Sequence, residues 1–108
     1  MSAIVTVYAT FCDAGEAGRI ARSVVEERLA ACANILAPCR SIYRWQDAIE
    51  DAQEVPALFK TRAELAPRLI ARIGELHSYD VPAALVWPIT DVLPAYGAWV
   101  SAQTMEPA

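Results

Sequence analysis

The sequence CANILAPCRSIYRWQDAIEDAQEVPALFKT, residues 32–61, predicts two long β-strands folded back on one tight turn. Residues 33–45 form the outgoing strand and residues 49–61 form the returning strand. Residues 46–48 lie between them, where Asp47 can supply turn geometry between residues that favour strands. We expect the rest of the chain to pack around this hairpin.

A loop of three residues would fix the register of the two strands, because facing residues would then have numbers that add up to 94. The favourable cross-strand pairs in this register are Arg44 with Glu50, Arg40 with Glu54, and Trp45 with Ile49. It also sets Pro38 opposite Pro56, and neither proline can donate to the ladder. We therefore expect a bend or bulge at the two prolines.

The length of the hairpin predicts that it extends beyond its own domain. About twelve strand residues at about 3.3 Å each span about 40 Å, whereas a domain of this size has a radius of gyration of about 13 Å. The overhanging part carries Ile42, Tyr43 and Trp45 rather than a row of lysines. An uncovered strand edge invites pairing with another chain, so we expect homo-oligomerisation through the hairpin.

The composition limits the classes of protein to which the chain can belong. Its 108 residues are 56% hydrophobic, which is enough to bury one core without disulfides or a structural metal. We therefore expect residues 1–108 to form a single domain. The 9 basic and 13 acidic residues give a net charge of -4 without a basic stripe, so nucleic-acid binding has little electrostatic support.

The sequence carries no signal for export or for a membrane span. The start, Met1 to Val5, lacks a charged segment followed by an apolar run, and no run of about eighteen apolar residues occurs. Three cysteines at no metal-motif spacing fit reduced thiols better than a disulfide framework. We predict a cytoplasmic location.

Further elements on both sides of the hairpin complete an α+β pattern. Residues 4–10 read as a buried strand and residues 83–89 as a second, shorter one. Asp13 and Glu16 have the spacing of a capping box, before a helix that reaches about Leu29.

Two more helices follow from the sequence. Thr61 and Glu64 can cap the first of them, and Pro67 either lies in its first regular turn or kinks it. Asp91 and Pro94 open a last helix. The resulting order predicts a ferredoxin-like βαββαβ sandwich with a long β-hairpin and an extra C-terminal helix.

Few residues suggest chemistry. His77 is either a helix-end histidine bonded to loop carbonyls, or a metal ligand or base. Cys32 is either a small core thiol or a metal ligand, and Cys12 and Cys39 offer soft ligands for Cu(I). We see no nucleophile with a base, no glycine loop for phosphate and no catalytic carboxylate pair, so we expect no enzymatic activity.

Several spaced motifs together resemble the CutA divalent-cation tolerance proteins. They include Glu27-Arg28-Leu29-Ala30-Ala31-Cys32-Ala33-Asn34-Ile35, Ser41-Ile42-Tyr43-Arg44-Trp45, His77-x-Tyr79-x-Val81-Pro82 and Tyr96-x-x-Trp99-Val100. The resemblance covers nearly the whole chain. It implies a ferredoxin-like subunit in a tight trimer, with long hairpins that engage neighbouring subunits, and a cytoplasmic role in tolerance to copper and other divalent ions.

The residue types and the resemblance together suggest where a site would lie. The candidate metal ligands are His77 and Cys32, with copper as the candidate ion and no cofactor required. Tyr43, Trp45, Lys60 and Tyr79 are the candidates for the cleft or interface between subunits. An alternative function, from the similar architecture of the PII trimers, is a signalling or scaffold trimer that binds a small ligand or a partner protein in these clefts.

Overall fold

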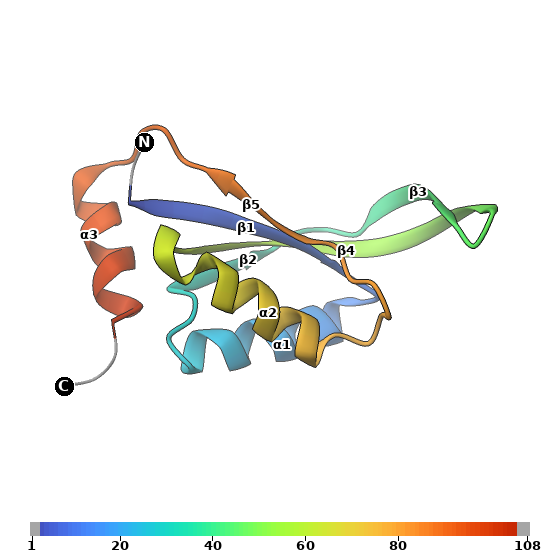
Figure 1. Ribbon diagram of the computed structural model, residues 1–108, viewed down its shortest axis with the longest axis horizontal. Coiled ribbons are helices and arrows are strands. Elements are labelled where there is room, and N and C mark those ends of the chain that lie inside the picture. Colours follow the sequence, from blue (N-terminus) through green and yellow to red (C-terminus); the bar gives the residue numbers. More distant parts are fainter. Residues whose placement is uncertain (1–2, 106–108) are drawn as a thin grey trace.

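Strand β4 (Ala48–Arg62) is the longest element and joins the two parts of the molecule. In the computed structural model, which describes residues 3–105, its C-terminal half lies between β1 (Ile4–Phe11) and β2 (Cys32–Ile35) (Figure 1). Its N-terminal half pairs with β3 (Cys39–Trp45), and β5 (Ala84–Pro88) pairs with the free side of β1. All of these pairings are antiparallel, and the main sheet has the order β2-β4-β1-β5.

Two helices cover one face of this sheet, and a third lies at its end. Helices α1 (Ala14–Glu26) and α2 (Ala66–Leu76) lie side by side below the sheet in Figure 1, and α3 (Pro94–Gln103) lies near the start of β1. The largest buried side chains between sheet and helices include Val7, Phe11, Val24, Phe59, Leu69 and Ile73. The predicted α+β class is confirmed, and the elements follow the predicted order except that the outgoing strand of the hairpin is divided into β2 and β3.

The predicted register of the hairpin is wrong by one residue. The loop holds only Gln46 and Asp47, which have φ angles of 50° and 65°, and Trp45 faces Ala48. Two residues with positive φ are typical of the tight turn whose twist matches that of the flanking strands. Facing residues therefore have numbers that add up to 93.

This shorter turn changes every predicted pair. The observed pairs are Arg44 with Ile49, Arg40 with Gln53 and Cys39 with Glu54. Arg40 instead forms an ion pair with its diagonal neighbour Asp51, at 2.6 Å between Nη2 and Oδ2. The prediction paired each charged residue with the residue directly opposite it. In the structure, Arg40 finds its opposite charge on a diagonal neighbour instead.

A bulge separates the two halves of the outgoing strand, as predicted near its proline. Three residues, 36–38, lie between β2 and β3, but only Val55 and Pro56 lie between their partners on β4. The outgoing strand thus holds one extra residue, which is the definition of a β-bulge. Pro38 does not face Pro56, whose partner on β1 is Thr10.

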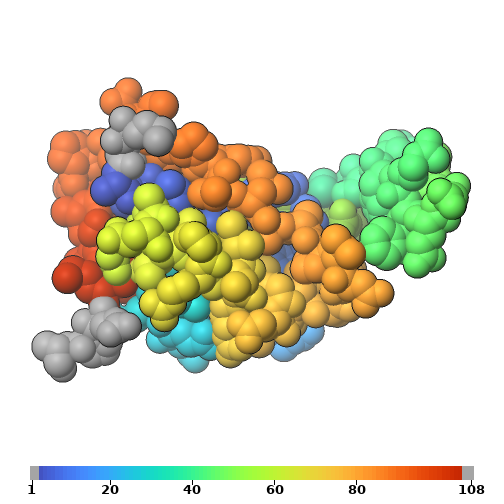
Figure 2. Space-filling view, in the orientation of Figure 1, coloured from blue at the N-terminus to red at the C-terminus, as the bar shows by residue number. Residues whose placement is uncertain are grey.

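The hairpin extends well beyond the rest of the chain. The molecule measures 47 × 27 × 22 Å, and Figure 2 shows the tip of the hairpin standing clear of the body. Ile42 and Ile49, diagonal neighbours on one face of the hairpin, are 64% and 61% exposed. The predicted overhang and its apolar surface are confirmed.

The predicted helix starts are right for α1 and partly wrong for the later helices. The side chain of Asp13 accepts a hydrogen bond from the backbone N–H of Glu16 at 2.8 Å. Thr61 caps no helix, because its hydroxyl donates to the carbonyl of Leu29 at 2.7 Å. A short 3-10 turn (Ala63–Leu65) precedes α2 instead, and Pro67 lies in the first turn of α2, which was one of the two alternatives.

The last helix begins at Pro94, with Leu93 rather than Asp91 at the capping position. Among residues 3–105 we find no helix that has both the length and the apolar character needed to cross a membrane.

Candidate functional site

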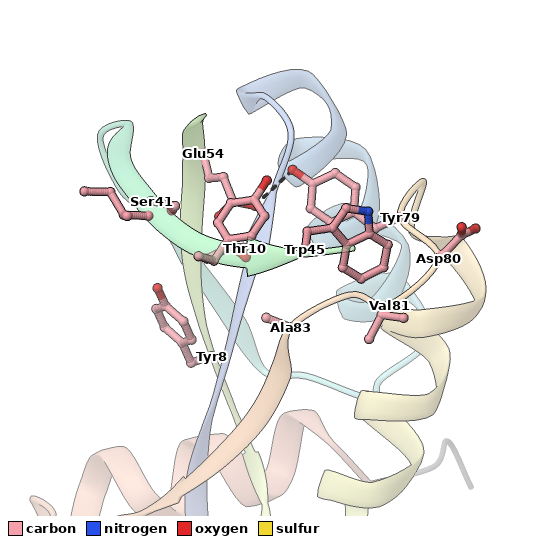
Figure 3. A pocket seen from close by; sticks show the side chains of 11 residues that line it. Tyr8, Thr10, Ser41, Trp45, Glu54, Tyr79, Asp80, Val81 and Ala83 are labelled. Atoms are coloured by element: carbon pink, nitrogen blue, oxygen red, sulfur yellow. Dashed lines mark hydrogen bonds between the residues drawn. The ribbon is translucent and has the colours of Figure 1, made fainter. Parts of the chain in front are cut away.

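A pocket of about 640 Å³ lies where the hairpin leaves the sheet (Figure 3). It is lined by Tyr8 and Thr10 of β1, by Ser41, Ile42, Tyr43 and Trp45 of β3, by Glu54 of β4, and by Tyr79, Asp80, Val81 and Ala83 of the loop after α2. Segments far apart in the sequence therefore meet in this pocket.

Strand alternation explains how β1 contributes to the pocket. Val7, Ala9 and Phe11 face the helices and are completely buried. Successive side chains of a strand point to opposite faces, so Tyr8 and Thr10 face the other side of the sheet. The pocket thus lies on the face of the sheet opposite to α1 and α2.

Glu54 and Tyr79 join the sheet to the loop across the pocket. The hydroxyl of Tyr79 donates a hydrogen bond to Oε2 of Glu54 at 2.9 Å, drawn as a dashed line in Figure 3. Glu54 is only 8% exposed. Burial raises the pKa of Tyr79, and the hydrogen bond to Glu54 raises it further. The phenol therefore stays protonated and keeps its role as donor.

His77 connects the backbone of Tyr79 to strand β1. Its Nε2 lies 2.7 Å from the carbonyl oxygen of Thr10, and its Nδ1 lies 3.1 Å from the backbone nitrogen of Tyr79. A carbonyl can only accept and an N–H can only donate, so both contacts are satisfied by a neutral ring with its proton on Nε2. The ring also stacks on Phe11 with 5.0 Å between centroids.

Glu16 fixes the loop that carries Tyr79 from the other side. Its carboxylate accepts hydrogen bonds from the backbone N–H of Cys12 at 3.2 Å and of Ser78 at 3.0 Å. Glu16 is 5% exposed. Burial raises the pKa of Glu16, but the hydrogen bonds from Ser78 and Cys12 outweigh burial and lower it overall. This carboxylate therefore joins the start of α1 to the loop after α2.

We predict that Glu16→Gln lowers the free energy of unfolding by about 1–3 kcal/mol at neutral pH, because the amide group turns a donor toward one of the two N–H groups. The native pKa of Glu16 lies below its ordinary value of 4.5. The contribution of the carboxylate is therefore complete above that value and is lost as the pH falls through the lowered pKa. Chemical denaturation at several pH values measures the difference between parent and variant.

The control is Glu26→Gln, which removes the same charge from an exposed position of α1. A constant difference between parent and Glu16→Gln from pH 7 to pH 2 would contradict the assigned role of the carboxylate.

The structure does not bring the two predicted metal ligands together. The thiol of Cys32 lies 3.3 Å from the hydroxyl of Tyr96. Across the sheet, Cys32 is level with Thr6, because both residues pair with Lys60. His77, in contrast, contacts the carbonyl oxygen of Thr10. Four strand residues separate these levels by about 13 Å. Within residues 3–105, no three His, Cys, Asp or Glu side chains gather around a common point that could hold a metal ion.

Of the four residues predicted for the cleft, three meet in the pocket. Tyr43, Trp45 and Tyr79 line it, whereas Lys60 lies outside it, with its ammonium group hydrogen-bonded to Asn34. Sequence reasoning missed Tyr8, Thr10 and Glu54. The alternation of strand 4–10 could have revealed the first two.

The chain is similar to known proteins along nearly its whole length. The family model for the CutA1 divalent ion tolerance protein matches residues 5–103. The divalent-cation tolerance protein CutA of Pyrococcus horikoshii is 42% identical over 101 residues, which cover 94% of this chain and 98% of that protein.

Solved structures show the same likeness in three dimensions. CutA from Xylella fastidiosa superposes with a TM-score of 0.93 at 36% identity, covering 96% of this chain and 100% of that one. The periplasmic divalent cation tolerance protein CutA from Archaeoglobus fulgidus superposes with a TM-score of 0.91 at 32% identity, covering 94% and 99%.

Proposed function

The chain belongs to the CutA1 divalent ion tolerance protein family, and from this premise we propose that it acts as a homotrimer in tolerance to divalent cations, copper among them. In this proposal residues 1–108 form one ferredoxin-like domain. The role is non-enzymatic, in keeping with a family that is named for tolerance and not for a reaction. The proposed location is the cytoplasm, where three free thiols stay reduced, although the Archaeoglobus relative is described as periplasmic.

The observation that supports assembly is the apolar surface of the overhanging hairpin, and the number of three subunits follows from the resemblance to the CutA proteins. Ile42 and Ile49 occupy one of its faces, and Tyr43 and Trp45 are also exposed in the single chain. Exposed apolar patches beside an unpaired strand edge are typical of association surfaces. We place Tyr43, Trp45, Lys60 and Tyr79 at the contacts between subunits.

Sedimentation equilibrium at micromolar concentration tests the assembly. We expect a mass three times the 11.8 kDa of one chain. A monomeric mass would contradict the proposal.

Copper binding is the second part of the proposal, with His77 and Cys32 as separate candidate ligands. Both ring nitrogens of His77 already take part in hydrogen bonds, so a metal ion must displace one of them. Between residues 3 and 105, neither residue belongs to a group of three potential metal ligands. We therefore propose weak copper binding, with water or another copy of the chain completing the coordination.

We predict that His77→Ala weakens Cu(II) binding without loosening the trimer, and that the parent binds Cu(II) more tightly than Zn(II), as the general affinity order requires. A chelator should leave the melting temperature unchanged, because the core is built from apolar side chains. Calorimetric titration and a thermal melt measure the two effects. Arg68→Ala, an exposed change on α2, is the control. Unfolding by the chelator, or equal Cu(II) binding by His77→Ala and the parent, would contradict this assignment.

The pocket favours a second candidate function, a PII-like signalling or scaffold trimer that binds a small ligand or a partner protein between its subunits. Its volume of about 640 Å³ is in the range of small-molecule sites. Titration of the trimer with nucleotides and carboxylates distinguishes this candidate from metal tolerance.

A further inference from the structure

We draw no further inference here: the strongest candidate, the pocket between the hairpin and the loop after α2, lies at the contacts between subunits that we propose above, so its openness in a single chain does not indicate a further ligand.

Discussion

Replacement of Phe59 by alanine is expected to lower the free energy of unfolding by about 3–5 kcal/mol. Phe59 lies on β4, between β1 and β2, and is completely buried. Its ring meets that of Phe11 edge to face, with 6.4 Å between centroids. The variant loses this contact and leaves a cavity that the surrounding strands cannot close. Chemical denaturation at one fixed protein concentration measures the effect.

The control for Phe59→Ala is Leu93→Ala, at a position that is 71% exposed, where we expect a change below about 0.5 kcal/mol. Similar losses for the two variants would show that the cavity at Phe59 does not determine stability.

The second large effect concerns assembly. Ile42→Asp is expected to dissociate the proposed trimer at micromolar concentration and leave the fold of each chain intact. Its side chain is already exposed in one chain, so in the isolated chain aspartate adds only a repulsion with Asp51, the residue that faces it on β4. At a well-packed interface it would bury an unpaired charge and remove an anchor, which typically costs more than about 2 kcal/mol.

Sedimentation equilibrium measures the mass of Ile42→Asp, and circular dichroism tests its fold. Leu93→Asp introduces the same charge at an equally exposed position outside the hairpin, and should remain a trimer. An unchanged trimer for Ile42→Asp would place this face of the hairpin outside the subunit contacts.

Local pattern predicted most of the fold. The apolar run from Ile4 to Thr10 and the spacing of Asp13 and Glu16 require neighbours only a few positions away, and the strand and helix that they predict are present. The length of the strands predicted the overhang in the same way. The resemblance to the CutA proteins added nothing to these local arguments, but it identified the family.

Two errors came from information that residue types do not carry. Gln46 and Asp47 both adopt positive φ, a conformation that residues other than glycine rarely adopt. Because neither position is a glycine, the residue types did not indicate a two-residue turn. Thr61 is of a residue type that often caps helices, but its hydroxyl donates a hydrogen bond to the carbonyl of Leu29, which is 32 positions away in the sequence. Tertiary partners of this kind decide between local alternatives of similar energy.

The site was harder to predict than the fold because it combines three strands and a loop. Tyr43, Trp45 and Tyr79 stood out as aromatic residues, but Glu54 was predicted only as the cross-strand partner of Arg40. The bulge at residues 36–38 and the shorter turn place Cys39 opposite it. Only the assembled sheet shows that Glu54 is buried beside Tyr79.

The bulge at residues 36–38 also bears on how copies of the chain can close upon themselves. If one of residues 36–38 were deleted, two residues would face Val55 and Pro56, and every other pair between the strands would stay the same. The deletion would remove the bend that the bulge gives to the hairpin. Identical contacts repeated head to tail form a closed ring only at one rotation per copy, and otherwise they continue as an open filament. In the proposed trimer, a single residue in this strand would thus set the angle on which closure depends.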